Sequence, residues 1–223
     1  MVVKICGITT LKDALTALAA GAGWLGFNFY SHSPRYLSPE ACRSLVEVIR
    51  PLYPEATLVG VFVNAPADEV WRILDECRLD LAQLSGDEPP EVLRHLGPRA
   101  FKAYRPRSQD EMEAFFLTYP LRADPPACLV DAAKPGVYGG SGQVADWSIA
   151  AWAAQRAPIL LAGGLTPENV AMAIDQVRPW GVDVASGVET APGCKDKARL
   201  EAFLRQARDA YAALSFSHSR GEP

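Results

Sequence analysis

Residues 159–176 read ILLAGGLTPENVAMAIDQ, and this stretch contains one complete βα unit. The apolar run at 159–162 predicts a short strand. Gly163 and Gly164 end that run, and Thr166 followed by Pro167 is typical of a helix N-cap with proline in the first turn. Apolar residues then recur at helical spacing as far as residue 176.

The same unit recurs along the whole chain. Strands are expected at 2–6, 25–29, 58–63, 79–84, 100–104, 128–131, 159–162 and 182–185. Helices are expected at 11–20, 39–49, 67–76, 109–117, 146–154, 167–176 and 196–213, with a short one near 91–95. Eight such pairs predict a (β/α)8 TIM barrel. An open doubly wound sheet is disfavoured because the unit lengths are nearly uniform and no GxGxxG follows the first strand.

Composition limits the remaining choices. A chain of 223 residues, 49% of them hydrophobic, suits one domain, which we place at 1–214. The polar tail 215–223 is expected to be disordered. A net charge of −4 without a basic stripe argues against a nucleic-acid partner. No apolar stretch is long enough to span a membrane and no signal peptide is evident, so a cytoplasmic location is expected.

The number and spacing of the cysteines predict that their thiols are reduced. There are five, which is an odd number, and none forms a CxxC pair. This pattern argues against a disulfide framework and against a zinc site. They lie at Cys6, Cys42, Cys77, Cys128 and Cys194.

The active site of a barrel lies at the carboxyl ends of its strands. Side chains alternate along a strand, so Lys4 and Cys6 are expected to face the interior. Asp183 on the last strand has the same parity, which predicts a buried Lys4–Asp183 ion pair below Cys6 when the barrel closes. Nearby cations would lower the pKa of the Cys6 thiol and make it a base. A structural thiol is the alternative, but the position at a strand end, before Gly7, favours a functional one.

Two charged residues follow other strands. Arg35 comes shortly after the second strand, where its planar guanidinium could bind a carboxylate through two hydrogen bonds. Asp131 ends the sixth strand after an apolar run, and partial desolvation there would raise its pKa enough for acid catalysis. The alternatives are a surface arginine that caps a carbonyl and a turn aspartate.

Glycines follow strands six, seven and eight. Backbone N–H groups of such loops commonly bind phosphate in barrels. The substrate is therefore expected to be a phosphorylated small molecule. The proposed phosphate ligands are Gly140, Gly142, Gly163, Gly164, Ser186 and Gly187.

Several motifs together resemble the phosphoribosylanthranilate isomerase family. They are KICGIT at 4–9, SPR at 33–35, LLAGGL at 160–165, PENV at 167–170 and VDVASGVE at 182–189. The resemblance spans the chain in the right order. One departure is Ser85, which stands where the family commonly has a histidine before Gly-Asp-Glu.

The resemblance implies an Amadori rearrangement in tryptophan biosynthesis that needs no metal or cofactor. N-(5′-phosphoribosyl)anthranilate becomes 1-(2-carboxyphenylamino)-1-deoxyribulose 5-phosphate. By position, Cys6 is the general base and Asp131 the general acid, while Arg35 binds the anthranilate carboxylate. Lys4 belongs to the substrate-binding set, and a monomer or a homodimer is expected.

Three other functions compete with this one. A sugar-phosphate isomerase of the histidine pathway would carry a carboxylate in place of Cys6. A thiamin-phosphate-synthase-like transferase would need an acidic magnesium site, for which the early loops hold no suitable aspartates. A non-catalytic phosphate-binding barrel would be favoured if Cys6 and Asp131 both pointed into the helix layer.

Overall fold

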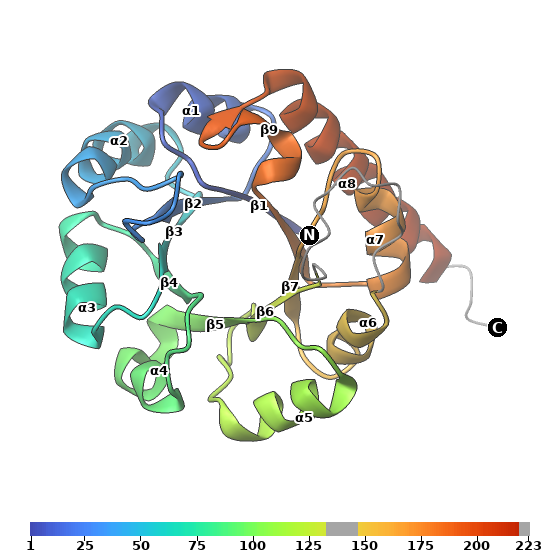
Figure 1. Ribbon diagram of the computed structural model, residues 1–223. Coiled ribbons are helices and arrows are strands. Elements are labelled where there is room, and N and C mark those ends of the chain that lie inside the picture. Colours follow the sequence, from blue (N-terminus) through green and yellow to red (C-terminus); the bar gives the residue numbers. More distant parts are fainter. Residues whose placement is uncertain (133–146, 219–223) are drawn as a thin grey trace.

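The computed structural model describes residues 1–132 and 147–218, with side chains as far as residue 214. Eight parallel strands form a closed barrel in sequence order, so the predicted (β/α)8 fold is confirmed. Figure 1 shows these strands as a central ring with the helices outside it. The strands are β1 (Val2–Cys6), β2 (Trp24–Asn28), β3 (Thr57–Phe62), β4 (Leu81–Leu84), β5 (Ala100–Tyr104), β6 (Cys128–Asp131), β7 (Ile159–Ala162) and β8 (Gly181–Val184).

The helices cover the outside of the barrel. They are α1 (Leu11–Ala19), α2 (Pro39–Leu52), α3 (Ala67–Glu76), α4 (Pro90–Leu96), α5 (Gln109–Thr118), α6 (Ser148–Ala154), α7 (Val170–Val177) and α8 (Lys197–His218). A 3₁₀ turn, η1 (Gly97–Arg99), precedes β5, and another, η2 (Ser186–Val188), follows β8. A hairpin of β9 (Glu189–Ala191) and β10 (Cys194–Lys195) then leads into α8. None of the helices in the described ranges is long and apolar enough to cross a membrane.

Several helix boundaries differ from the prediction; α2, for example, ends at Leu52 and not at Ile49. Helix α7 begins at Val170 rather than at Pro167, because the Thr166 carbonyl accepts from both Asn169 and Val170 in a preceding turn. Helix α8 continues to His218, so residues 215–218 are helical and do not belong to the tail predicted to be disordered. The sequence offers no glycine or proline there to end the helix. Residues 219–223 lie outside the described part.

Alternation along the strands produces two apolar layers. Strand residues that point outward pack under the helices in one large core. Strand residues that point inward form a separate cluster in the barrel, composed of Trp24, Val59, Leu81, Phe101, Leu129, Leu160 and Ala162. The interior is therefore filled with side chains, as in other barrels, and the polar inward residues lie toward the carboxyl ends of the strands.

Candidate active site

The residues proposed from the sequence lie at the carboxyl ends of the strands. Cys6 ends β1 and Asp131 ends β6. Arg35 lies in the loop after β2. Gly163 and Gly164 follow β7, and Ser186 and Gly187 follow β8. Gly140 and Gly142 lie outside the described residues.

The predicted buried ion pair is confirmed. Lys4 on β1 stands beside Asp183 on β8 in the strand register, and 2.8 Å separates Lys4 Nζ from Asp183 Oδ1. The Lys4 side chain is fully buried. Burial opposes the charged ammonium, but the Asp183 carboxylate and the neighbouring Cys6 thiol outweigh it and raise the pKa of Lys4. The Lys4 ammonium therefore stays charged inside the barrel.

A glycine on β2 makes room for the thiol. A Cβ atom at Gly26 would lie 2.9 Å from Cys6 Sγ and 3.1 Å from Lys4 Nζ, which is closer than real Cβ atoms normally allow. The thiol and the ammonium thus border the same small space. Cys6 consequently faces the barrel interior and not the helix layer.

The predicted net lowering of the pKa of Cys6 is wrong, although the nearby cations do act in that direction. Burial raises the pKa of the thiol above its ordinary value of 9.0, and Asp183 adds to this effect. Lys4 and Lys195 act in the opposite direction but do not compensate. The sequence reveals the cation beside the thiol, but not that the surroundings of the thiol oppose its ionisation more strongly than the cations favour it.

Arg35 has a protein partner that the sequence does not reveal. Its Nε donates to both carboxylate oxygens of Glu189, at 2.9 and 3.1 Å, and its Nη2 donates to Oε2 at 2.6 Å. Gly7 has a φ of +75°, and a Cβ there would lie 2.5 Å from Arg35 Cδ. Glycine at this position therefore lets the arginine pack over the end of β1.

Glu189 and Lys195 form the centre of a buried network. Lys195 Nζ lies 2.8 Å from Glu189 Oε1 and also donates to the carbonyls of Cys6 at 2.6 Å and Ala185 at 3.3 Å. Burial opposes ionisation of Glu189, but hydrogen bonds from Arg35 and Lys195 outweigh it and lower its pKa. The network ties the ends of β1 and β8 to the Arg35 loop.

The loops after β7 and β8 pack closely together. Gly163 and Gly164 adopt positive φ values of 97° and 66°. A Cβ at Gly187 would lie 1.9 Å from the Leu165 carbonyl oxygen, so glycine is required there. Among the described residues, no atom lies within 4 Å of a Cβ built on Gly164. Such a juxtaposition of glycine loops suits an anionic group.

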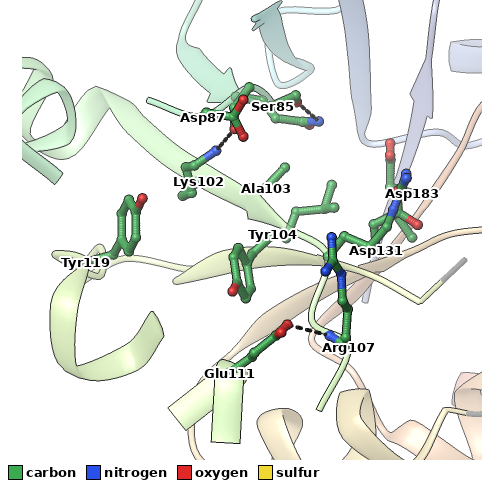
Figure 2. Close-up of a pocket in the computed structure, with 15 residues that line it drawn as sticks. Ser85, Asp87, Lys102, Ala103, Tyr104, Arg107, Glu111, Tyr119, Asp131 and Asp183 are labelled. Atoms are coloured by element: carbon green, nitrogen blue, oxygen red, sulfur yellow. Dashed lines mark hydrogen bonds and ion pairs between the residues drawn. The ribbon is translucent and has the colours of Figure 1, made fainter. Parts of the chain in front are cut away.

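A cavity of about 720 Å³ opens at the barrel mouth. Figure 2 shows Ser85 and Lys102 on one side of it and Asp131 and Asp183 on the other. Asp131 lines this cavity and forms an ion pair with Arg105, whose side chain is largely exposed. The predicted place of Asp131 is confirmed, but its neighbour is charged and not apolar. Cys6 is not among the lining residues, whereas Asp183, the partner of the neighbouring Lys4, is.

A second buried ion pair supports the wall of the cavity. Lys102 Nζ donates to Glu88 Oε2 at 2.9 Å and to the carbonyls of Leu84 at 3.3 Å and Gly86 at 2.5 Å. Its three donors are therefore all used. Sequence reasoning missed this pair, although Glu88 belongs to the Gly-Asp-Glu segment after Ser85.

Comparison with known proteins decides the family. The family model described as N-(5′-phosphoribosyl)anthranilate (PRA) isomerase matches residues 3–206. The chain belongs to this PRA isomerase family. An N-(5′-phosphoribosyl)anthranilate isomerase of Trichlorobacter lovleyi is 46% identical over 209 residues, which cover 93% of this chain and 98% of the relative.

Solved PRA isomerases have the same fold. The enzyme from Thermotoga maritima gives a TM-score of 0.83 at 41% identity and covers 94% of this chain and 100% of its own. A PRA isomerase in complex with reduced 1-(o-carboxyphenylamino)-1-deoxyribulose 5-phosphate gives 0.79 at 38% identity, with 94% and 100% covered. Membership of the PRA isomerase family makes this chain an isomerase of tryptophan biosynthesis, which decides against the histidine-pathway enzyme, the transferase and the non-catalytic barrel.

Proposed function

We propose that Cys6 is the general base and Asp131 the general acid in the isomerisation of N-(5′-phosphoribosyl)anthranilate. The supporting observation is their placement. A thiol and a carboxylate end two separate strands, β1 and β6, at the same mouth of the barrel. Asp131 lines the cavity directly, and the thiol lies against Lys4, whose partner Asp183 also lines it.

Two proton transfers account for the reaction. Asp131 gives a proton to the furanose ring oxygen, the C1′–O bond breaks as the anilino lone pair forms a C1′=N bond, and the open chain is a protonated Schiff base. Cys6 as thiolate then removes the proton from C2′, the electron pair of that C–H bond forms the C1′=C2′ bond, and the C1′=N π pair returns to nitrogen to give the neutral enolamine. Tautomerisation of the enolamine yields the C2′ ketone. Groups on separate strands suit these separate steps.

The proposed mechanism requires Cys6 to be deprotonated and Asp131 to be protonated. Because burial raises the pKa of the Cys6 thiol, the thiol form predominates at neutral pH in the free enzyme. A thiolate of raised pKa is, however, a stronger base once it has formed. Lys4 and Lys195 both stabilise its charge, which gives Lys4 its place in the proposed substrate-binding set. On the other side, Arg105 forms an ion pair with Asp131 and has to release it before proton donation.

Arg35 retains an edge for the substrate carboxylate. Glu189 occupies Nε and one side of Nη2. A guanidinium has five N–H donors, so the edge formed by Nη1 and the second hydrogen of Nη2 remains for a second carboxylate. Glu189 would then hold the guanidinium in position while the opposite edge binds anthranilate.

The phosphate is proposed to bind at the loops after β7 and β8. The proposed ligands Gly163, Gly164, Ser186 and Gly187 lie in these packed loops. Gly140 and Gly142 complete the set and fall in the part of the chain that is not described. Backbone N–H groups would supply the hydrogen bonds.

Kinetics of two variants test the acid and the base. Cys6→Ala and Asp131→Asn should each lower kcat by about 10²–10⁴-fold, because each removes a proton transfer. The loss of substrate fluorescence measures the rate, and affinity for inorganic phosphate should stay unchanged. Matched controls are Cys194→Ala and Asp124→Asn, which alter exposed residues. A folded variant with near-wild-type kcat would remove that residue from the mechanism.

We also infer a cytoplasmic enzyme that is a monomer or a homodimer. The location follows from the biosynthetic role, and the described residues include no membrane-spanning helix. The T. maritima relative is described as dimeric, and its engineered monomers are 37% identical to this chain with a TM-score of 0.78. Light scattering after gel filtration distinguishes the two states.

A further inference from the structure

Gln83 is a polar residue inside an otherwise apolar strand. It lies two residues after Leu81, which belongs to the inner barrel cluster, so both side chains face inward. Only 6% of Gln83 is exposed, and the residue lines the cavity that also contains Asp131 and Asp183. Nothing in the acid–base mechanism uses it.

One end of the Gln83 amide is anchored and the other is not. Its Nε2 donates to Ser85 Oγ at 3.1 Å, and the Ser85 N–H is itself held by the Phe62 carbonyl at 2.8 Å. Its Oε1 is shielded from water and has no hydrogen-bond partner among the described residues. A buried acceptor without a donor is costly and rare in folded proteins.

The neighbouring donors cannot satisfy this oxygen. Lys102 also lines the cavity, but its three N–H groups go to Glu88, Leu84 and Gly86. Lys4 and Lys195, the other buried lysines near the mouth, are paired with Asp183 and Glu189. A donor supplied by a ligand would satisfy Oε1 after a small turn about the terminal torsion, which has a broad energy minimum in glutamine.

An amide oxygen restricts the part of the substrate that it can contact. It can only accept, so it cannot bind the phosphate or the carboxylate, which are acceptors themselves. The sugar hydroxyls and the anilino N–H are the available donors. During the proposed reaction the O–H on C2′ becomes a ketone, the anilino nitrogen passes through a Schiff base, and the C4′ oxygen starts as part of the ring. Only the C3′ hydroxyl remains an O–H donor in every species.

We propose that Gln83 is a substrate-positioning residue whose Oε1 accepts a hydrogen bond from the C3′ hydroxyl. In the structure Ser85 Oγ accepts from Nε2, which leaves Oε1 as the end of the amide offered to the substrate. The inference rests on the proposed function, since it takes the phosphate to lie at the β7 and β8 loops and the carboxylate at Arg35. Gln83 on β4 then contacts the sugar between them and holds C2′, the carbon next to C3′, in place.

A binding cycle tests this contact directly. The probes are reduced 1-(2-carboxyphenylamino)-1-deoxyribulose 5-phosphate and its analogue that lacks the C3′ hydroxyl. For the wild-type protein, loss of the hydroxyl should weaken binding about tenfold, equivalent to ~1.4 kcal/mol. For Gln83→Met, which has a similar volume and no amide, the two probes should bind within about twofold of each other. Titration calorimetry measures all four affinities.

Three further measurements separate positioning from a structural role. Gln83→Met removes an unpaired buried acceptor, so its Tm should stay equal or rise while its affinity for the reduced product falls. Because the contact persists from substrate to product, KM should rise with kcat little changed. Ser85→Ala keeps Gln83 but removes the hydrogen bond that holds its amide. The ratio of affinities for the probes with and without the C3′ hydroxyl should therefore fall from about tenfold to about fivefold. Gln176→Met, an exposed substitution on α7, should leave every value unchanged.

The outcomes also distinguish this inference from the proposed function. If Gln83→Met discriminates between the two probes as the wild-type protein does, the contact does not exist. The same conclusion follows if Gln83→Met does not fold and Ser85→Ala keeps the full tenfold discrimination. If the wild-type protein fails to bind the reduced product at all, the proposed substrate is wrong as well. Unchanged binding of inorganic phosphate to Gln83→Met would locate the loss at the sugar.

Discussion

Lys4 and Asp183 form an ion pair across the seam at which the last strand of the barrel meets the first, with 2.8 Å between Nζ and Oδ1. Both side chains lie inside the barrel, and the lysine has no exposed surface. The pair also borders the Cys6 thiol. One interaction thus supports both the closure of the barrel and the charge next to the proposed base.

Lys4→Met should destabilise the protein by about 3–5 kcal/mol, because it leaves the Asp183 carboxylate buried without a counter-charge. Urea unfolding measures the free energy. The control is Arg72→Met, which breaks the exposed Arg72–Glu76 pair on α3 and should cost under about 1 kcal/mol. Adding Asp183→Leu to Lys4→Met should recover much of the loss. Equal costs for Lys4→Met and Arg72→Met would mean that the pair contributes nothing.

Glu189→Gln should weaken catalysis through Arg35. The neutral amide cannot accept both hydrogen bonds from the guanidinium, so Arg35 loses its fixed orientation. We expect KM to rise about tenfold or more, equivalent to at least ~1.4 kcal/mol. Arg35→Lys should have a larger effect on kcat/KM, since an ammonium cannot bind a carboxylate side by side.

Steady-state kinetics of the double variant provide the check. If Glu189 acts through Arg35, the loss in Arg35→Lys/Glu189→Gln should be smaller than the sum of the two single losses. Glu201→Gln is the control, because Glu201 forms only an exposed pair with Lys197 on α8. Strict additivity would show that Glu189 does not act through the arginine.

The lowered pKa of Glu189 leads to a prediction of how stability depends on pH. Arg35 and Lys195 outweigh burial and hold the pKa of Glu189 below its ordinary value of 4.5. A group whose pKa is depressed on folding stabilises the protein above its unfolded pKa, and this stability is lost as the pH falls through the folded value. The Tm difference between wild type and Glu189→Gln should therefore be largest above pH 4.5 and shrink below it. Thermal scans between pH 7 and pH 3 measure this difference, and a gap that widens in acid would contradict the prediction.

The strands and the pair inside them could be predicted from the sequence for one physical reason. Alternation along a strand fixes which side chains face inward, and closure of the barrel makes the first and last strands neighbours. Together these rules bring Lys4 and Asp183 together although 179 residues separate them. Cys6 and Asp131 follow from the same rules, because each ends a strand.

Loops are governed by no such rule. The Arg35–Glu189 contact spans 154 residues and depends on how the β9–β10 hairpin folds back over the end of β1. Two hydrogen bonds, from Thr9 to the Gly193 carbonyl and from Lys195 N–H to Asp13, fix that path. Burial depth is equally hidden in the sequence. For this reason the direction of the shift in the pKa of Cys6 had to come from the structure.

The raised pKa of Cys6 leads to a prediction about its reactivity. Only the thiolate reacts with alkylating agents. Because burial and Asp183 outweigh Lys4 and Lys195, the pKa of Cys6 lies above 9.0 and the thiol form dominates at neutral pH. The exposed Cys194 is an internal reference in the same chain.

Iodoacetamide should therefore modify Cys6 much more slowly than Cys194 at pH 7, and the Cys6 rate should still be rising above pH 9. Peptide mass spectrometry after timed quenching follows each thiol separately. In Lys4→Met the Cys6 rate at a given pH should fall further, because the cation that opposes burial is gone. The inflection of each pH–rate profile separates this electrostatic effect from steric protection. Steric protection would lower the rate without moving the inflection. If the alkylation rate of Cys6 instead has its inflection below pH 8, the thiolate is stabilised in the free protein. The effect of the cations on the pKa of Cys6 would then exceed the effect of burial.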